Sequence, residues 1–247
     1  MSTVPSTENR IQTAHLLLDR FAERTGLTGT GGDPARRYLW TDAFAVQAFF
    51  GLARGLEEPA YHERALQLID LVHEHLGAYH PDDEREGWIS GLPEAEARRH
   101  PTAGGLRIGK ELPEREKDDA FDDRLEWRRD GQYFHYLTRW YTALLRAAEE
   151  TGEPKYARWA AEGMLAARPF LYHGNGRPRM YWKMSTDLSR PLVSSMGAHD
   201  PLEGLLCTAS AQQAAPSLKK ELQALQQDFR AICTGRDWWT SDALGIG

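Results

Sequence analysis

The sequence of 247 residues has little cysteine, no excess of positive charge and no long hydrophobic run. Its two cysteines, Cys207 and Cys233, exclude a disulfide-rich scaffold and have no metal-ligand spacing. The net charge of −6 excludes the basic surface that nucleic-acid binding needs. No run of about 18 apolar residues exists to cross a membrane. Residues 1–10 lack the pattern of a signal peptide, so we expect a cytoplasmic protein with reduced thiols.

Helical periodicity dominates what is present. Segments that are apolar nearly all round, which predicts burial, alternate with segments that have one polar face. In chain order these segments span 9–26, 38–56, 57–77, 131–152, 153–170, 200–215 and 216–235. The turns at 58–61 and 153–156 share the sequence Glu-Pro-x-Tyr, with proline in the first helical turn and tyrosine packing back. A repeated helical hairpin is therefore predicted.

Two stretches interrupt the alternation. Residues 78–130, the rim insertion, are rich in glycine, proline and charge, and predict an arm along one rim with a short helix near 93–99. The acidic run at 114–130 lacks the spacing of a calcium loop, and its interspersed basic residues indicate a solvated, internally paired arm. Residues 171–199 contain the strand-like sequence RMYWKM and predict a β-hairpin or an ordered loop.

The hairpin pattern and several short sequences together resemble a known fold family. The short sequences are YLWTDAF, GWISGLPE, HPTAGGLRIGK, DGQYFHYL, MYWKMSTDLSRPL and MGAHDPLEGL. Over 8–77 and 131–247 the chain resembles a bacterial branch of the six-hairpin glycosidase superfamily, whose fold is the (α/α)6 toroid. The resemblance rests on architecture and turn sequences rather than on a diagnostic catalytic motif. It implies a single all-α domain over 1–247, with the apolar helices as an inner ring.

The predicted ring is incomplete. About three and a half hairpins are present, and TSDALGIG at 240–247 reads like the start of another inner helix. We expect a truncated chain, with a ring closed by a second copy or an open arc as alternatives. An exposed half-ring would leave inner-helix apolar surface in water and would tend to associate, so a homo-oligomer is expected if the ring is incomplete.

In such a ring the inner helices are parallel, so their N-terminal ends meet on one face. The acidic residues and the histidine at or near these ends are Asp42, Asp130, His199, Asp200, Glu203 and Asp242. Paired carboxylates across a cleft hydrolyse glycosidic bonds, one as acid and the other as base. We predict an inverting glycoside hydrolase with Asp200 as base and Asp42 or Asp130 as acid. Helix capping alone would also explain each aspartate.

Residues close to these helix starts are candidates for sugar binding. They are Trp40, Tyr133, His135, Trp182, Asp187 and Arg190. Aromatic rings present flat apolar faces on which a sugar ring can stack, although core packing explains most aromatic residues equally well. A basic side chain of the loops, Arg107, Lys110 or Arg190, could hold the carboxylate of a uronic sugar.

Two alternative functions stay open. The resemblance also covers sugar epimerases that use histidine pairs, for which His135 and His199 are the candidates. The other alternative is a non-catalytic helical scaffold that binds a partner or a sugar. No P-loop, dinucleotide fingerprint or metal-ligand cluster is present, so we expect no cofactor, no metal and a small-molecule carbohydrate as partner. His73 and His75, two positions apart on a helix, are expected at the surface.

Overall fold

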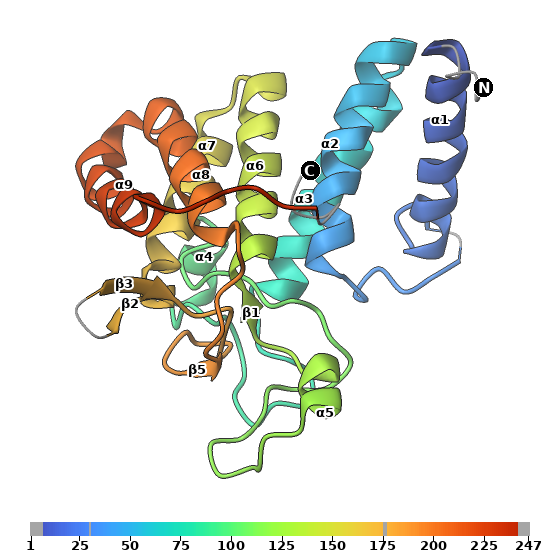
Figure 1. Ribbon diagram of the computed structural model, residues 1–247. Coiled ribbons are helices and arrows are strands. Elements are labelled where there is room, and N and C mark those ends of the chain that lie inside the picture. The colour runs from blue at the N-terminus through green and yellow to red at the C-terminus, as the bar shows by residue number, and fades with distance from the viewer. Residues whose placement is uncertain (1–6, 30, 175–176, 242–247) are drawn as a thin grey trace.

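Three helical hairpins form the helical body of the computed structural model, which describes residues 7–29, 31–174 and 177–241 (Figure 1). They are α2 (Leu39–Leu56) with α3 (Pro59–Leu76), α6 (Phe134–Thr151) with α7 (Pro154–Ala166), and α8 (Asp200–Ala214) with α9 (Lys219–Cys233). A further helix, α1 (Thr7–Arg24), packs on α2. Short 3₁₀ turns, η1 (Arg168–Phe170) and η2 (Pro216–Leu218), follow α7 and precede α9. The predicted alternation of helices is confirmed. The observed bounds lie within a few residues of the predicted ones, except that α7 ends at Ala166 and the predicted segment ended at residue 170.

The repeated turn sequence has the predicted geometry. Pro59 and Pro154 each begin the second helix of a hairpin, where the missing N–H has no helical partner to lose. Tyr61 and Tyr156, two positions later, are both buried in the core. Tyr61 stacks on Phe49 of the preceding helix, with ring centroids 6.1 Å apart. The turn therefore fixes the second helix of each hairpin against the first.

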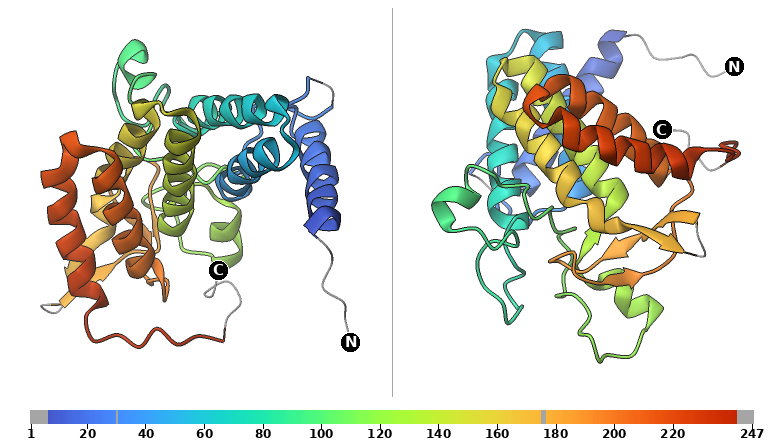
Figure 2. Two further views of the ribbon diagram at one scale, coloured as in Figure 1. Left: turned by 90° about the horizontal axis from the view of Figure 1, so that it is seen from above. Right: turned by 90° about the vertical axis from the view of Figure 1, so that its left-hand side faces the viewer.

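The hairpins stand side by side, with α2, α6 and α8 as neighbouring inner helices. α2 packs on α6 and α6 packs on α8, while α3, α7 and α9 cover them from outside (Figure 2). The close approach of α8 and α9 requires glycine at 204, because a Cβ there would lie 2.5 Å from the Phe229 ring. The N-terminal ends of α2, α6 and α8 all point toward the long loops (Figure 1). Within the described residues, no helix is long and apolar enough for a bilayer span.

The core between these helices is rich in aromatic side chains, and it contains one unexpected histidine. Phe49, Phe50, Trp140 and Tyr141 are fully buried. His73 is also buried, and its Nε2 accepts a hydrogen bond from Trp140 Nε1 at 3.1 Å. The expectation that His73 lies at the surface is therefore wrong. Burial lowers the pKa of His73 to about 3, so the ring is neutral and able to accept this bond.

Two small antiparallel sheets lie beneath the inner helices, so the protein is mainly rather than wholly α. The hairpin of β2 (Leu171–Gly174) and β3 (Arg177–Met180) confirms the predicted β-hairpin. The second sheet has the order β1 (Gln132–Tyr133), β4 (Lys183–Met184) and β5 (Pro191–Val193). It was not predicted, because the residues of β1 were assigned to the following helix. Its pairing depends on contacts between segments far apart in the chain, which local periodicity does not reveal.

The rim insertion contains two short helices and paired charges. The predicted short helix is present as α4 (Glu94–Ala97). A second helix, α5 (Asp123–Arg128), begins after Asp122, whose carboxylate accepts the Leu125 N–H at 2.9 Å. Within the acidic run Arg115 pairs with Glu126 and Arg129 with Asp119, as predicted. Glu114 and Glu126 are buried rather than solvated, and they also pair with Arg85 and Lys183 from outside the run.

Candidate functional site

A groove of about 500 Å³ runs between the inner helices α6 and α8. Glu203 of α8 lines it and is bound from the other side by two residues of α6. Its Oε1 accepts from Arg139 Nη2 at 2.8 Å, and its Oε2 accepts from Thr138 Oγ1 at 2.9 Å. A guanidinium and a hydroxyl that both donate to one group are the arrangement of an ionised carboxylate. Glu203 therefore crosslinks the two helices and presents a carboxylate to the groove.

Asp200 is the first residue of α8 and lies one helical turn before Glu203. Its side chain is buried, and its Oδ2 has no hydrogen-bond partner among the described residues. Burial first, and then the charge of Glu203, raise the pKa of Asp200 to about 7. The two carboxyl groups thus lie in different environments: Asp200 is buried with a raised pKa, while Glu203 is ion-paired with Arg139. Neighbouring carboxyl groups in such different environments are suited to separate roles as acid and base.

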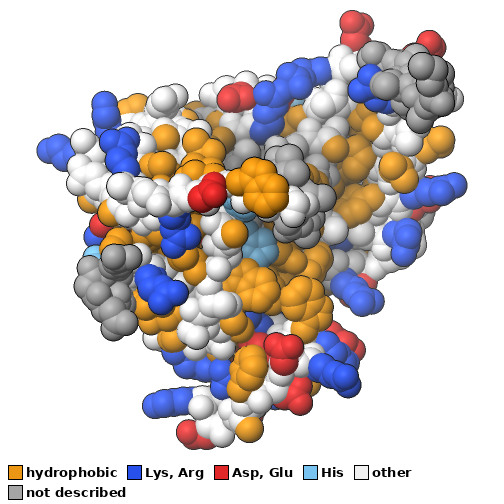
Figure 3. Space-filling model, in the orientation of Figure 1, with side chains coloured by type: hydrophobic (Ala, Val, Ile, Leu, Met, Phe, Trp, Pro, Cys, Tyr) orange, Lys and Arg blue, Asp and Glu red, His pale blue; other side chains and the backbone are white. Residues whose placement is uncertain are grey.

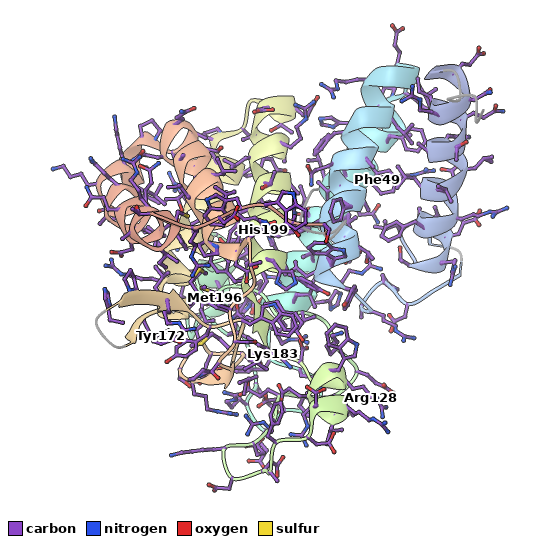
Figure 4. The ribbon with its side chains drawn as sticks, viewed as in Figure 1. Phe49, Arg128, Tyr172, Lys183, Met196 and His199 are labelled. Atoms are coloured by element: carbon purple, nitrogen blue, oxygen red, sulfur yellow. The ribbon has the colours of Figure 1, made fainter. Side chains whose placement is uncertain are left out.

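Asp200 is covered by the segment that precedes α8. A Cβ on Gly197 would lie 2.3 Å from Asp200 Oδ1, so this segment packs directly on the carboxyl group. His199 stands at the groove itself, where its Nε2 lies 3.4 Å from the carbonyl oxygen of Trp238 (Figure 4). The segment that carries Trp238 crosses this face after α9 (Figure 1).

The starts of α2 and α6, together with Trp182 from the link between β3 and β4, bring six rings together; we call them the aromatic cluster. Its members are Tyr38, Trp40, Tyr133, His135, Tyr136 and Trp182. Trp40 and Tyr136 have centroids 5.0 Å apart, and Tyr133 and Trp182 have centroids 5.1 Å apart. Trp40, His135 and Trp182 are only partly buried, so part of their surface remains open to a ligand. On the face drawn in Figure 3, histidine side chains lie among hydrophobic ones.

His135 connects the aromatic cluster to the groove. It lies one turn before Arg139 on α6, and its ring stacks on Tyr133 with centroids 5.4 Å apart. Its Nδ1 is buried and has no hydrogen-bond partner in the part of the chain that the structure describes. Burial, and then the charge of Arg139, lower the pKa of His135 to about 4. The ring is therefore neutral at physiological pH.

Asp42 does not line the groove. The residue is 1% exposed, and its Oδ2 accepts the backbone N–H of Tyr38 at 3.1 Å at the start of its own helix. The Nε of Arg37 lies 3.9 Å from the same oxygen. Burial raises the pKa of Asp42 to about 6, although Arg37 acts in the opposite direction. The structure thus gives Asp42 a bond within the start of α2 and does not bring it to Glu203.

Asp130 is likewise held inside the protein. It is fully buried and forms an ion pair with the guanidinium of Arg107. Its Oδ1 also accepts the N–H groups of Gly109 at 3.0 Å and Gly131 at 3.1 Å. Asp130 is thus bonded on both oxygens and fully buried, whereas the Glu203 side chain is 23% exposed, so Asp130 anchors the rim insertion beneath the inner helices.

The remaining predicted residues hold loops together or fall outside the structure. Asp187 accepts hydrogen bonds from Ser185 and Ser189, both at 2.7 Å. Arg190 donates to the carbonyl oxygen of Arg115 and does not line the groove. Asp242 lies outside the described residues. Of the predicted site residues, His199 and Glu203 line the groove, Asp200 is buried one turn before Glu203, and Trp40, Tyr133, His135 and Trp182 belong to the aromatic cluster.

Sequence reasoning missed the α6 partners of Glu203. Thr138 and Arg139 lie within the predicted buried helix 131–152, where they read as interior or solvent-facing positions. The density of aromatic residues at the starts of two inner helices was a usable signal for Tyr38 and Tyr136. The described residues contain no group of three or more side chains suited to a metal ion. Comparison with protein-family models, curated proteins and solved structures finds no match for the chain.

Proposed function

We propose that the chain is a carbohydrate-active enzyme that hydrolyses a glycosidic bond. The aromatic cluster binds the sugar, and Asp200 and Glu203 supply the two carboxyl groups. The observation that carries this proposal is a buried carboxyl group with an unpartnered oxygen, one helical turn before an ion-paired carboxylate, together with partly open aromatic rings. Stacking faces and a carboxyl pair are what glycoside hydrolysis requires.

The chemistry assigns a role to each carboxyl group. Asp200 gives its proton to the glycosidic oxygen as the bond from the anomeric carbon to that oxygen breaks. Glu203 accepts a proton from the water molecule whose oxygen forms the new bond to the anomeric carbon. This assignment reverses the base role that the sequence suggested for Asp200, because the group with the raised pKa is the better acid. The segment around Gly197 has to move for Asp200 to reach a substrate.

The arrangement of the hairpins supports the resemblance on which this function was first suggested. Parallel inner helices covered by outer helices are the building pattern of an α/α toroid, and α2, α6 and α8 with their partners follow it. We propose that the three hairpins are a segment of such a ring. Leu206 of α8 and Phe44 of α2 are exposed, at 60% and 46%, which suits an inner face that further helices or a second copy would cover.

We also propose the cytoplasm as the compartment. Both cysteines are free, with Cys207 buried and Cys233 partly buried. Unpaired thiols persist most readily in a reducing compartment.

A histidine-dependent sugar isomerase is a second candidate. The neutral ring of His135, with an unpartnered Nδ1 among aromatic rings, favours it specifically. A neutral imidazole can accept or donate a proton at a bound sugar. In this alternative Glu203 orders Arg139 near His135 and takes no part in the chemistry.

Release of reducing ends from a panel of defined oligosaccharides tests the proposal. Glu203→Gln is expected to lower kcat at least about 100-fold, as expected when a general base is removed. The matched control is Glu149→Gln, which removes another carboxylate of the same groove and is expected to stay within about twofold. Interconversion of sugars that requires His135 would support the isomerase instead. Binding without turnover would support a scaffold, and equal activity of Glu203→Gln would contradict the proposed base.

A further inference from the structure

Lys110 stands at the edge of the aromatic cluster. Its Nζ lies 3.3 Å from the hydroxyl of Tyr38, which in turn lies 2.7 Å from the hydroxyl of Tyr136. The same ammonium group lies 5.2 Å from the centroid of the Tyr38 ring and 4.7 Å from that of Trp127. The Trp127 side chain, on α5, is 57% exposed. An ammonium group and an open indole ring therefore extend the aromatic cluster on the side of the rim insertion.

The charge of Lys110 has no counter-ion in the described part of the chain, where no carboxylate lies within 4.0 Å of its Nζ. The acids around it are paired with other cations. These pairs are Glu111 with Arg128, Glu126 with Lys183 and Arg115, and Asp130 with Arg107. A partly buried ammonium group that meets only hydroxyl and aromatic partners is a strong attractor for an anion.

The other basic side chains considered for this role are already occupied. Arg107 is 5% exposed and donates to Asp130 and to the carbonyl oxygens of His75, at 2.7 Å, and Ala78, at 2.6 Å. Arg190 donates to a backbone carbonyl oxygen in the loops below. Of the three candidates, Lys110 alone keeps donors for a ligand at the aromatic cluster.

We propose that the carbohydrate taken by this site is acidic, and that Lys110 binds the carboxylate of a uronic acid unit. The sugar ring of that unit packs on Trp127, and its carboxylate accepts a hydrogen bond from the Lys110 ammonium group. The inference names the substrate class of the carbohydrate site and rests on the proposed function.

Calorimetric titration with two matched probes tests it: a trisaccharide of glucuronic acid and the corresponding trisaccharide of glucose. The wild-type protein is expected to bind the acidic probe at least about tenfold more tightly at low salt, with a smaller preference at 0.15 M salt because the pair is partly exposed. Lys110→Met is expected to abolish that preference, so that affinity for the acidic probe falls to that for the neutral probe. Lys117→Met removes an exposed lysine of the same arm and serves as the control.

The outcomes separate this inference from the proposed function. Equal binding of both probes by the wild-type protein, or an equal loss for both in Lys110→Met, would overturn the role of Lys110 while leaving a carbohydrate site in place. Tighter binding of glucose 6-phosphate than of glucuronic acid would overturn the carboxylate assignment. Binding of neither trisaccharide would overturn the proposed function together with this inference. Lys110→Gln is a second variant that removes the charge. Both Lys110 variants must keep the melting temperature of the wild type, which excludes a folding defect as the cause of any loss of binding.

Discussion

The rings of Trp40 on α2 and Tyr136 on α6 lie with their centroids 5.0 Å apart, at the starts of two neighbouring inner helices. Side chains far apart in the chain become neighbours here because α2 and α6 run in the same direction. The two ring planes are inclined at 35°, and Tyr136 also packs edge-on against Tyr38 and His135. A preformed aromatic surface binds a ligand without a further ordering cost for its own side chains.

Removing the partly open rings is expected to weaken carbohydrate binding. Trp40→Ala and Trp182→Ala should each raise the Kd for a bound oligosaccharide about tenfold, because each removes a stacking surface. Titration calorimetry measures the change, with Phe121→Ala as a control that removes an exposed aromatic side chain outside the aromatic cluster. A change in Kd as large for Phe121→Ala as for Trp40→Ala would contradict the assigned surface.

Asp130→Asn is expected to destabilise the fold without a specific effect on turnover. The substitution leaves the buried guanidinium of Arg107 without its counter-ion, which costs about 3–5 kcal/mol of unfolding free energy. Urea denaturation measures the loss. Replacing both partners, as in Arg107→Met with Asp130→Asn, should cost less than the sum of the single changes. Unchanged stability with lost turnover would instead make Asp130 the acid that the sequence suggested.

The protonation of Asp200 is expected to appear in the pH dependence of stability. Its pKa is about 7 in the folded protein, well above that of an unfolded aspartate, so folding binds its proton more tightly. The stability that this proton contributes is complete at about pH 4 and is lost as the pH rises through 7. The unfolding free energy of the wild type minus that of Asp200→Asn should therefore fall over this range, by at most about 1.4 kcal/mol per pH unit.

The wild type is compared with Asp200→Asn because other buried groups change the unfolding free energy in the opposite direction as the pH rises. The pKa of His135 is lowered to about 4, so its contribution rises with pH over part of the same range. Denaturation curves at several pH values, with Asp118→Asn as a control at an exposed position, measure the difference. A difference that does not change with pH would show that Asp200 is ionised in the folded protein.

Glu57→Gly is expected to stabilise the protein by about 1 kcal/mol, because glycine adopts the left-handed region without steric cost. Glu57 has φ of 54°, and Gly152, which occupies the same place two residues before the turn proline of the next hairpin, has φ of 70°. Chemical denaturation measures the gain, and Glu58→Gly, at an extended position with φ of −112°, should give none. A loss of stability in Glu57→Gly would show that the carboxylate contributes more than the backbone strain costs.

The sequence predicted the helices well because their evidence is local. Apolar spacing and the two Glu-Pro-x-Tyr turns are contained in single segments, and both match the structure. The strand pair of Tyr133 with Lys183 involves distant residues; Lys183 lies in the strand-like sequence RMYWKM, but nothing local marks Tyr133 as a strand residue. The same limit applies to His73, whose burial depends on Trp140 of another hairpin.

The candidate site was predictable only in part, for the same reason. An aspartate near a helix start is visible in the sequence, but its partner is not. Asp130 is neutralised by Arg107 from the rim insertion, whereas Glu203 is bound by Arg139 and left facing a groove. Position near a helix start therefore identified the candidate acids. Only the tertiary contacts distinguished the acids that stabilise the fold from those at the groove.

The most direct test of the account is a crystal structure of the Glu203→Gln variant with a bound oligosaccharide. We expect a sugar ring against Trp40 or Trp182 and a glycosidic oxygen near residues 200 and 203. A sugar bound elsewhere on the molecule, with the aromatic cluster and the groove between α6 and α8 unchanged and empty, would contradict it.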